Sequence, residues 1–422
     1  MTTKEQNELM TRVGPDTRMG KLLRRYWHPV AALDEMIGRW TKRVRLLGED
    51  LVLFKTRNGA FGLIEENCPH RRASFFHGMP TENGIRCPYH GWHFDPSGTC
   101  IEQPFEKGRN ALLGKQVADA YPVEELGGML FAYLGPKPAP LLPRFAEFLW
   151  PRAIRAIGRF DIPCNWLQCM ENSADPVHTE WLHGHLHQFR NEELGVQTAI
   201  AKQHDRIAFD DFEFGLVKRR LYVGQSEESE DWQVGHPLVF PNILLVGSSG
   251  GSWKAHTFQI RVPIDDTNTA QYWYHAYVPP MEADVDGRLL HQVPPFYVPK
   301  LKDENGEYDM DYIDAQDIMA WVTQGPIADR SRENLAASDR GVVAYRRMLM
   351  AELEKSERGE DPRGVLRDPA RNAEIILPLE KGKNMYTDGF ASFQSRLAIS
   401  FSPVIDDLNR LFTPKAKQIE SV

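Results

Sequence analysis

Two short Cys/His pairs constrain this chain more than any other feature of its sequence. The stretch CPHRRASFFHGMPTENGIRCPYHGW, residues 68–92, contains Cys68-x-His70 and, after sixteen intervening residues, Cys87-x2-His90. The chain has only five cysteines, so the pattern does not come from a cysteine-rich composition. Two thiolates and two imidazoles can complete a tetrahedral zinc site. They can also hold a [2Fe–2S] cluster in which two histidines ligate one iron.

The residues around the two pairs favour the iron–sulfur cluster over zinc. Each loop supplies one cysteine and one histidine, whereas zinc fingers usually place two cysteines in one loop. Pro69 and Pro88 stiffen the loops, because proline fixes φ and removes a backbone donor. We therefore predict a Rieske cluster, with zinc and buried thiols as the alternatives. The remaining cysteines lack histidine partners and are interpreted as small core residues: Cys100, Cys164 and Cys169.

The pattern of turns and apolar residues predicts an α+β chain in three parts. Residues 1–42 are expected to form an N-terminal helical segment, 43–136 an all-β domain that carries the motif, and 145–422 a larger α+β domain. Asn58-Gly59 between apolar runs is typical of a hairpin. The proline-rich stretch 137–145 is interpreted as a linker.

Charge and composition exclude several classes of protein. The net charge is −8 and the pI is about 6.0, which argues against a protein that coats nucleic acid. An acidic substrate would need a locally basic pocket. No run of about 18 apolar residues occurs, so we expect no membrane span. The polar first residues and sparse cysteines predict a cytoplasmic location.

A second group of candidate metal ligands lies in NWLQCMENSADPVHTEWLH, residues 165–183. Asp175 and His178 share a helix face because they are three residues apart. His178 and His183 are about 140° apart on a regular helix, so the helix must end or be distorted if both bind one metal. Two histidines and a carboxylate form the facial triad of non-haem Fe(II) oxygenases; the alternative is a pair of hydrogen-bonded structural histidines. The two histidines that follow are not expected to bind metal: His185 and His187.

The third ligand must be a carboxylate from elsewhere, and candidates cluster in DYIDAQDIMAWVTQ, where Asp311, Asp314 and Asp317 occur. On a helix, Asp317 shares its face with apolar residues, and a charge there is costly unless it is paired or metal-bound. Asp311 and Asp314 have simpler, solvated interpretations. We therefore predict Asp317 as the ligand. The alternative is a buried salt bridge to one of two arginines, Arg330 or Arg332.

With both groups identified, the chain resembles the catalytic α subunit of Rieske non-haem iron aromatic-ring oxygenases. The resemblance runs from about residue 10 to residue 350 and is most specific in CPHR…CPYHGW and NWLQCMENSADPVHTEWLHG. RVGPDTRMGKLLRRYWHPVA and QD-x-MAW-x-x-QGPIADR are similar to the phthalate dioxygenase branch, which includes ring dioxygenases and O-demethylases acting on aromatic acids.

The resemblance implies the architecture and the cofactors of such an enzyme. It implies a helix-grip catalytic domain with a curved antiparallel sheet, a [2Fe–2S] Rieske cluster and a mononuclear Fe(II). It also implies O₂ as the oxidant and electrons from NAD(P)H, delivered by a flavin/iron–sulfur reductase or a ferredoxin. A homotrimer is expected, in which the cluster of one subunit serves the iron of its neighbour.

The resemblance also implies roles for single residues. Asp175 matches a bridging carboxylate that hydrogen-bonds His178 and, across the subunit interface, a cluster histidine matching His90. Asp175 is therefore expected to orient a ligand rather than to bind the metal. Asn172 matches a residue close to the iron that is usually not a tight ligand. Asp317 matches the carboxylate ligand.

One departure from the branch concerns the substrate. Phthalate-type enzymes often have an arginine in the strand after Pro-Asn, whereas this strand reads PNILLVGSSGGSW and is apolar at residues 244–246. This favours a bulkier or less charged aromatic acid, such as a methoxylated or biaryl acid. The basic run Lys218-Arg219-Arg220 could supply a carboxylate clamp, or it could be a solvated strand edge.

The expected function is that of a terminal oxygenase that oxidises an aromatic acid by O-demethylation or by ring hydroxylation. The first alternative is a phthalate-type dioxygenase that forms a ring cis-diol. Two other classes are a Rieske electron carrier without oxygenase activity and a zinc-stabilised binding module.

Overall fold

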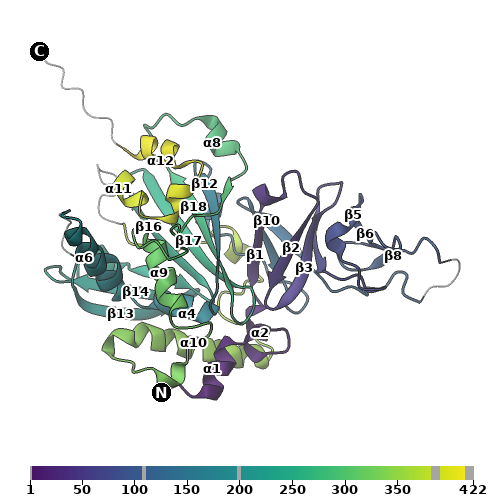
Figure 1. The fold of residues 1–422 in the computed structure, drawn as a ribbon, viewed down its shortest axis with the longest axis horizontal. Coiled ribbons are helices and arrows are strands. Elements are labelled where there is room, and N and C mark those ends of the chain that lie inside the picture. Colours follow the sequence, from purple (N-terminus) through teal and green to yellow (C-terminus); the bar gives the residue numbers. More distant parts are fainter. Residues whose placement is uncertain (1, 107–110, 197–200, 382–389, 414–422) are drawn as a thin grey trace, which may run out of the picture.

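The computed structural model describes residues 2–106, 111–196, 201–381 and 390–413. Figure 1 shows two β-rich parts: a smaller one formed by the first third of the chain, and a larger one around a long sheet. The two N-terminal helices, α1 (Lys4–Thr11) and α2 (Arg18–Leu23), lie below them in this view. This α+β arrangement is the fold class predicted from the sequence.

The smaller part contains, among the described residues, three antiparallel sheets with the strand orders β1-β11-β10, β2-β3-β4-β9 and β5-β6-β7-β8. The strands are β1 (Trp27–Ala32), β2 (Thr41–Leu46), β3 (Glu49–Lys55), β4 (Phe61–Glu65), β5 (Met79–Pro80), β6 (Ile85–Arg86), β7 (His93–Phe94), β8 (Cys100–Glu102), β9 (Ala120–Tyr121), β10 (Val123–Leu126) and β11 (Met129–Tyr133). Strand β1 falls within residues 1–42, which the sequence led us to expect as a helical segment. It instead pairs with β11, with Trp27 opposite Tyr133.

The predicted hairpin joins β3 and β4. Gly59 at its turn has φ 95°, a conformation that glycine adopts without strain. The Asn58 side chain accepts hydrogen bonds from the Ala60 N–H and the Thr56 hydroxyl, which stabilises the turn. The turn fixes the register that points residues such as Phe54 and Ile64 into a small core. That core also contains the buried Cys68 and Cys87, so the hairpin and the motif loops pack on the same core.

The larger part is built on an eight-stranded sheet with the order β13-β14-β15-β16-β17-β18-β12-β19. Its pairs are antiparallel except β12 with β19. The strands are β12 (Ile154–Ile162), β13 (His204–Phe212), β14 (Gly215–Tyr222), β15 (His236–Val239), β16 (Ile243–Gly250), β17 (Trp253–Pro263), β18 (Thr269–Val278) and β19 (Phe296–Tyr297). The predicted strand after Pro-Asn is therefore β16.

The two faces of this sheet have different roles, because alternate residues of a strand point to opposite sides. On β17, Phe258, Ile260 and Val262 join the main hydrophobic core. Burial of side chains of this size contributes about 1.5–3 kcal/mol each. Arg261 points to the other face, where its guanidinium lies 5.7 Å from the Trp321 ring. We call this second side, toward Trp321, the helix-facing side of the sheet.

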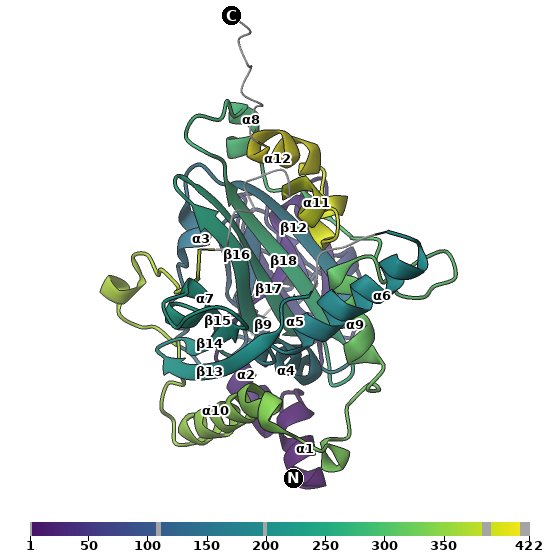
Figure 2. The same cartoon turned by 90° about the vertical axis from the view of Figure 1, so that its left-hand side faces the viewer.

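Helices cover the helix-facing side (Figure 2). They are α4 (Trp166–Ala174), α5 (His178–Glu180), the π-helical turn η3 (Trp181–His185), α6 (Leu186–Glu193) and α9 (Ile313–Val322). Helix α4 packs against both β17 and α9. Shorter helices lie in the connections: α3 (Ala146–Leu149), α7 (Glu230–Gln233) and α8 (Gly287–His291).

A buried ion-pair network holds α4 in place. Glu171 of α4 accepts hydrogen bonds from Arg330 at 2.7, 2.8 and 3.0 Å and from Arg346 at 2.6 Å. Arg346 lies on α10 (Arg340–Glu357) and also pairs with Glu333. Removing one partner of such a network costs about 3–5 kcal/mol, because the remaining charge stays buried. The network therefore ties α4 to segments far away in the sequence.

The C-terminal helices close one end of the large sheet. Helices α11 (Phe390–Gln394) and α12 (Ile405–Phe412) form a second core with sheet residues such as Trp253 and Tyr277. Phe390 stacks on Phe412 with ring centroids 4.7 Å apart. In the described part of the chain, no helix is both long enough and apolar enough to cross a bilayer.

Candidate metal centres

The two motif loops of the smaller part meet at one end of the molecule, at the right of Figure 1. Cys68 follows β4, and Cys87 follows β6. Each loop is closed by backbone hydrogen bonds, from Arg72 N to Cys68 O at 2.9 Å and from Gly91 N to Cys87 O at 3.0 Å. The rings of His70 and His90 lie 4.5 Å apart between centroids. The folded loops therefore bring all four side chains to the same place.

The environment of Cys68 suits a metal-bound sulfur. Burial raises the pKa of the Cys68 thiol to about 12, while the backbone N–H groups of His70 and Arg71 point at its sulfur and act in the opposite direction. Metal binding deprotonates such a thiol and puts the negative charge where these N–H groups stabilise it. The donor set and its surroundings fit a [2Fe–2S] cluster with two histidine ligands.

The cysteine and histidine ends of this group differ in exposure. Both cysteines are buried, whereas His90 is exposed and its neighbour Tyr89 is 54% exposed. His70 stacks on Trp92 with ring centroids 4.4 Å apart. The histidine end therefore lies at the protein surface, where a partner can approach it.

The second group lies on an interrupted helix in the larger part. Helix α4 ends at Ala174, Asp175 caps it in an extended conformation, and Pro176 follows before α5 begins. The next turn, η3, is a π-helix, as expected for a helix distorted between His178 and His183. A π-helix repeats after about five residues, so it places His178 and His183 on one face. The sequence NSADPVHTEWLH thus forms a bend at Pro176 followed by a π-helical turn. A regular helix over the same residues would not place both histidines on one face.

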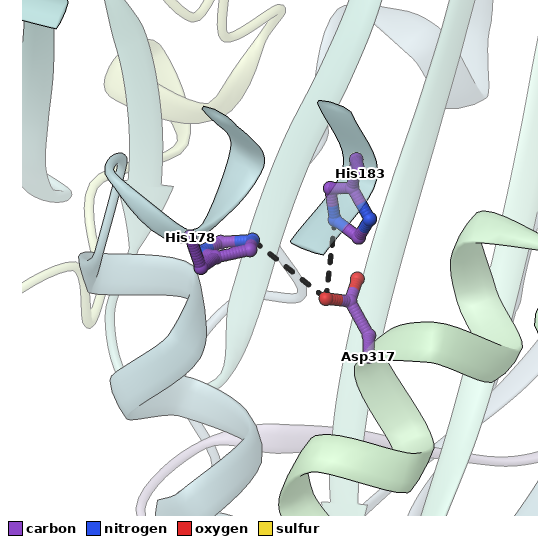
Figure 3. Close-up of side chains that lie close together, drawn as sticks. All are labelled: His178, His183 and Asp317. Atoms are coloured by element: carbon purple, nitrogen blue, oxygen red, sulfur yellow. Dashed lines mark ion pairs between the residues drawn. The ribbon is translucent and has the colours of Figure 1, made fainter. Parts of the chain in front are cut away.

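Figure 3 shows His178 and His183 converging on Asp317 from helix α9. The Asp317 Oδ1 atom lies 3.6 Å from His178 Nε2 and 3.2 Å from His183 Nε2. One ligand atom from each residue lies within 4.8 Å of the others, and no other cluster of this kind occurs among the described residues. Although burial opposes both charges, the pKa of His183 is raised by Asp317 and that of Asp317 is lowered by His183.

The other two aspartates considered from the sequence lie elsewhere. Asp311 is at the surface and pairs with Arg190 at 3.3 Å. Asp314 was expected to be solvated, which is wrong: it is buried and accepts hydrogen bonds from Trp273 Nε1 and Ala398 N, both at 2.7 Å. Burial raises the pKa of Asp314 to about 6. Neither Arg330 nor Arg332 forms the salt bridge considered for Asp317 in the described part of the chain, and Arg330 pairs with Glu171 instead.

Gln316 is a site residue that the sequence analysis missed. Its Nε2 donates to the Met310 carbonyl at 2.6 Å, which leaves its Oε1 facing His183 Nδ1 at 2.8 Å. Because that oxygen can only accept, His183 Nδ1 must carry a proton, so in the neutral ring the lone pair is on Nε2, on the side of Asp317. Its position next to Asp317 in the sequence was the only available signal.

Asp175 and Asn172 lie beside the three converging residues. Asp175 Oδ2 lies 3.6 Å from His178 Nδ1, and its Oδ1 accepts from the Val177 N–H at 2.8 Å. His178 Nδ1 is buried and has no other partner among the described residues. Asn172 Nδ2 donates to Asp317 Oδ1 at 3.3 Å. Both residues therefore contact a member of the group without adding a further convergent ligand atom.

The two later histidines are not part of this group of converging residues. The His185 ring packs against Trp181, with centroids 4.5 Å apart, and its Nε2 lies 3.9 Å from Glu180. His187 contacts Asn191 of the same helix. The histidines after His183 thus have local partners, and their exclusion as ligands stays a prediction.

Comparison with known proteins identifies the family. The Rieske [2Fe-2S] domain model matches residues 26–121, and a model described as LigXa C-terminal domain like matches residues 300–376. The oxygenase subunit of 5,5'-dehydrodivanillate O-demethylase from a Sphingobium species is 42% identical over 384 residues, covering 90% of this chain and 87% of that protein. The chain is a Rieske non-haem iron oxygenase.

Further relatives place the oxygenase in the phthalate dioxygenase-like branch. The oxygenase subunit of phthalate 4,5-dioxygenase from Pseudomonas putida is 32% identical and covers 86% of this chain and 89% of that protein. Solved structures share the fold: NdmA of Pseudomonas putida CBB5 has a TM-score of 0.60 at 20% identity, covering 87% of the oxygenase and 99% of NdmA. The oxygenase in the reduced complex with ferredoxin of carbazole 1,9a-dioxygenase has a TM-score of 0.59 at 19% identity. The match covers 88% of this chain and 97% of that oxygenase chain.

The basic run of the oxygenase does not form one cationic clamp. Lys218 is buried and donates to the Ser173 carbonyl at 2.9 Å, and burial lowers the pKa of Lys218 to about 7. Arg219 points to the opposite face of β14 and pairs with Asp210. Arg220 lies on the same face as Lys218 and pairs with Glu380 at 2.9 Å. Internal carboxylates therefore already neutralise both arginines.

The apolar strand after Pro-Asn faces both sides of the sheet. Leu245 belongs to the main core, whereas Leu244 and Val246 pair with Gln259 and Thr257, whose side chains lie on the same side as Arg261. The helix-facing side of β16 is therefore apolar at the positions where the phthalate-type pattern often has an arginine.

Proposed function

We propose that this oxygenase removes a methyl group from a methoxylated aromatic acid, with Fe(II) held by His178, His183 and Asp317. The observation that carries the proposal is the convergence of these three side chains from α5, η3 and α9. Two imidazoles and one carboxylate on one side of a metal leave coordination positions open for small molecules. An electron carrier would have no use for this second centre.

The same proposal assigns the Rieske cluster to Cys68, His70, Cys87 and His90. When bound, the cluster supplies one-electron transfer and the Fe(II) supplies oxygen activation, while the protein supplies binding and orientation. The surface position of the histidine end and the buried position of the cysteine end support electron exchange through the histidines.

The residues around the iron ligands orient them. Gln316 fixes the tautomer of His183 so that Nε2 is the free nitrogen. Asp175 faces His178 Nδ1 and is positioned to accept its proton in a hydrogen bond, which leaves His178 Nε2 free in the same way. Asn172 donates to Asp317 and limits the rotation of its carboxylate. None of the three needs to bind the metal itself.

The partners follow from the family. We infer that electrons come from NAD(P)H through a flavin/iron–sulfur reductase or a ferredoxin, with O₂ as the oxidant. We also infer a homotrimer in which Asp175 connects the iron of one subunit with the cluster histidine His90 of the next. The five cysteines are all unpaired, which supports a cytoplasmic location.

O-demethylation is preferred over ring dihydroxylation for two reasons. The relative that is 42% identical is named an O-demethylase subunit, whereas the phthalate 4,5-dioxygenase subunit is 32% identical. In addition, the helix-facing side of β16 carries Leu244 and Val246, which suits an aromatic ring better than a second carboxylate.

Turnover of defined aromatic acids tests this function. The oxygenase is supplied with a compatible reductase and NADH and given aromatic acids with and without methoxy groups, including biaryl diacids. We expect formaldehyde in proportion to the NADH consumed, and no cis-diol. A cis-diol without formaldehyde would instead make it a ring dioxygenase.

A variant separates the two metal centres in the same assay. We expect His178→Ala to lose the mononuclear iron and all turnover, and to keep the visible absorption of the cluster. Turnover by His178→Ala at the wild-type rate would refute the assignment of the iron site.

A further inference from the structure

A buried carboxylate with one free oxygen lies on the helix-facing side of the large sheet. Glu380 is only 4% exposed, and its Oε1 accepts from Arg220 at 2.9 Å and contacts His236 Nδ1. Its Oε2 is also buried but receives no hydrogen bond from any described residue. A buried acceptor without a donor is unfavourable. Where such an atom lies beside a catalytic centre, a hydrogen-bond donor of the substrate can supply the missing partner.

The position of Glu380 relative to the iron site follows from the sheet register. Lys218 and His236 are directly opposed on β14 and β15, so their side chains are neighbours on one face. Arg220, two residues along β14, points the same way. Lys218 contacts the Ser173 carbonyl of α4 and interacts electrostatically with both Asp175 and Glu380. Glu380 therefore lies near the segment that carries the iron ligands, with His236 and Lys218 between its carboxylate and the Ser173 carbonyl.

The charges at this place define the chemistry that Glu380 can recognise. Although burial favours the neutral acid, His236 and Arg220 hold the pKa of Glu380 below its usual range, so the group is an ionised acceptor. Arg220 is engaged by Glu380 and lies 3.6 Å from Asp231, so its charge is already balanced. A substrate carboxylate here would meet a like charge. A neutral hydroxyl that donates a hydrogen bond fits instead.

We propose that Glu380 accepts a hydrogen bond from a phenolic hydroxyl of the substrate and thereby selects aromatic acids that carry a free phenol. This inference rests on the proposed O-demethylase function and adds a specificity-determining residue to it. The acid group of the substrate must then be bound elsewhere than at the Arg220–Glu380 pair.

Two matched substrates test the proposal on the wild-type oxygenase. In 4-hydroxy-3-methoxybenzoate and 3,4-dimethoxybenzoate the acid group and one methoxy group are shared, and only the phenol is capped in the second. We expect the phenolic compound to bind at least about tenfold more tightly, because an unpaired buried polar group discriminates strongly against an analogue that lacks its partner. The dissociation constants are measured by anaerobic equilibrium dialysis, and the corresponding 5,5'-linked biaryl diacids are compared in the same way.

Substitution of Glu380 should remove this preference. In Glu380→Gln, Arg220 attracts the amide oxygen, so the amide N–H₂ faces the substrate and can donate equally to a hydroxyl or a methoxy oxygen. We expect the two affinities to become equal within about twofold and KM to follow them. Glu147→Gln is the matched control. Glu147 is a buried carboxylate that contacts His256 at 3.0 Å and also has a free Oε2, but His256 alternates with Thr257 and so lies on the opposite face of the sheet.

The outcomes distinguish failure of this inference from failure of the proposed function. Retained preference in Glu380→Gln, equal binding of both compounds by the wild type, or loss of preference in Glu147→Gln would each overturn the role of Glu380. Absence of formaldehyde from every substrate with the wild type would overturn the O-demethylase function, and the binding constants would still decide the inference. If Glu380→Gln does not retain the cluster absorption, Glu380→Asp replaces it. Glu380→Asp should keep a weakened preference for the phenolic compound, and an unchanged preference would refute the role of Glu380.

Discussion

Gln316 shows how one uncharged side chain can determine which nitrogen of a histidine faces a metal. Its amide is oriented by the Met310 carbonyl, and its oxygen in turn makes His183 Nδ1 the protonated nitrogen. A hydrogen bond of this kind fixes both the tautomer and the ring orientation of a metal-binding histidine. The orientation of the iron ligands therefore depends on a residue that is hydrogen-bonded to a ligand and does not bind the metal itself.

Replacing Gln316 by leucine should weaken iron binding without affecting the cluster. The change removes the acceptor for His183 Nδ1, and loss of such a partner typically lowers metal affinity about 10–100-fold. The measurement is the rate of iron loss to a chelator, with the cluster absorption as an internal reference. Gln168→Leu is the control, because Gln168 is an equally buried glutamine that binds the Trp321 and Gly325 carbonyls instead. Equal iron loss in both variants would contradict the assigned role.

Residue spacing predicted most of the candidate site, and its limits have physical reasons. Metal geometry constrains the spacing of ligands along the chain. This makes six of the candidate ligands recognisable from the sequence: Cys68, His70, Cys87, His90, His178 and His183. Asp317 could be selected because a charge on an apolar helix face needs a partner. The partners of Asp314, by contrast, come from β18 and from Ala398, which only the tertiary fold brings together.

At the level of elements, the π-helical turn η3 performs the main geometric task. It converts a five-residue spacing, which a regular helix would spread over about 140°, into two histidines on one face. The requirement for a distorted helix was predictable from the spacing of His178 and His183. The type of distortion was not, since a helix end between His178 and His183 would have satisfied it equally well.

Changing the length of this turn by one residue should affect iron binding asymmetrically. Inserting one alanine after Glu180 rotates His183 by about 100° away from Asp317, and we expect complete loss of the mononuclear iron. Deleting Leu182 instead leaves the two histidine ligands four residues apart, so that they share a face of a regular helix. We expect this variant to retain part of its mononuclear iron. Iron per cluster is the quantity to measure, and full iron content in the insertion variant would refute the assignment.

Local elements were predicted better than long-range pairing. The Asn58-Gly59 hairpin, the strand after Pro-Asn and the helix containing Asp317 all follow from short sequence patterns. Strand β1 was missed because its partner β11 lies about one hundred residues away, and nothing local in WHPVAA distinguishes it from the end of a helical segment.

At the level of the whole molecule, the two candidate centres lie in different parts of the protomer. The motif loops are at the far end of the smaller part, and the iron-site helices cover the opposite side of the larger part (Figure 1). The histidine end of the cluster site is exposed, and Asp175 lies beside His178. This arrangement supports the proposal that electrons pass between neighbouring subunits rather than within one chain.

Mixing two inactive variants tests this arrangement. Cys87→Ser removes the cluster and His178→Ala removes the iron site, so neither homotrimer should turn over. Co-expression in equal amounts should restore about a quarter of the wild-type activity, because one in four subunit interfaces then joins an intact cluster to an intact iron site. Variants assembled separately and mixed afterwards serve as the control. An inactive co-assembled mixture would show that transfer occurs within a chain.

The segment that carries the iron ligands has two halves of different character. Helix α4 is almost entirely buried and tied down through Glu171, whereas η3 and α6 contain no buried residue. Helix α4 belongs to the core, and the exposed turn η3 contributes His183. Removal of the iron should therefore loosen only η3 and α6, which contribute no buried residue to the core. We expect the oxygenase to be emptied of this metal and refilled while the rest of the protein stays folded, so that its supply of active enzyme responds to the iron available rather than to new synthesis.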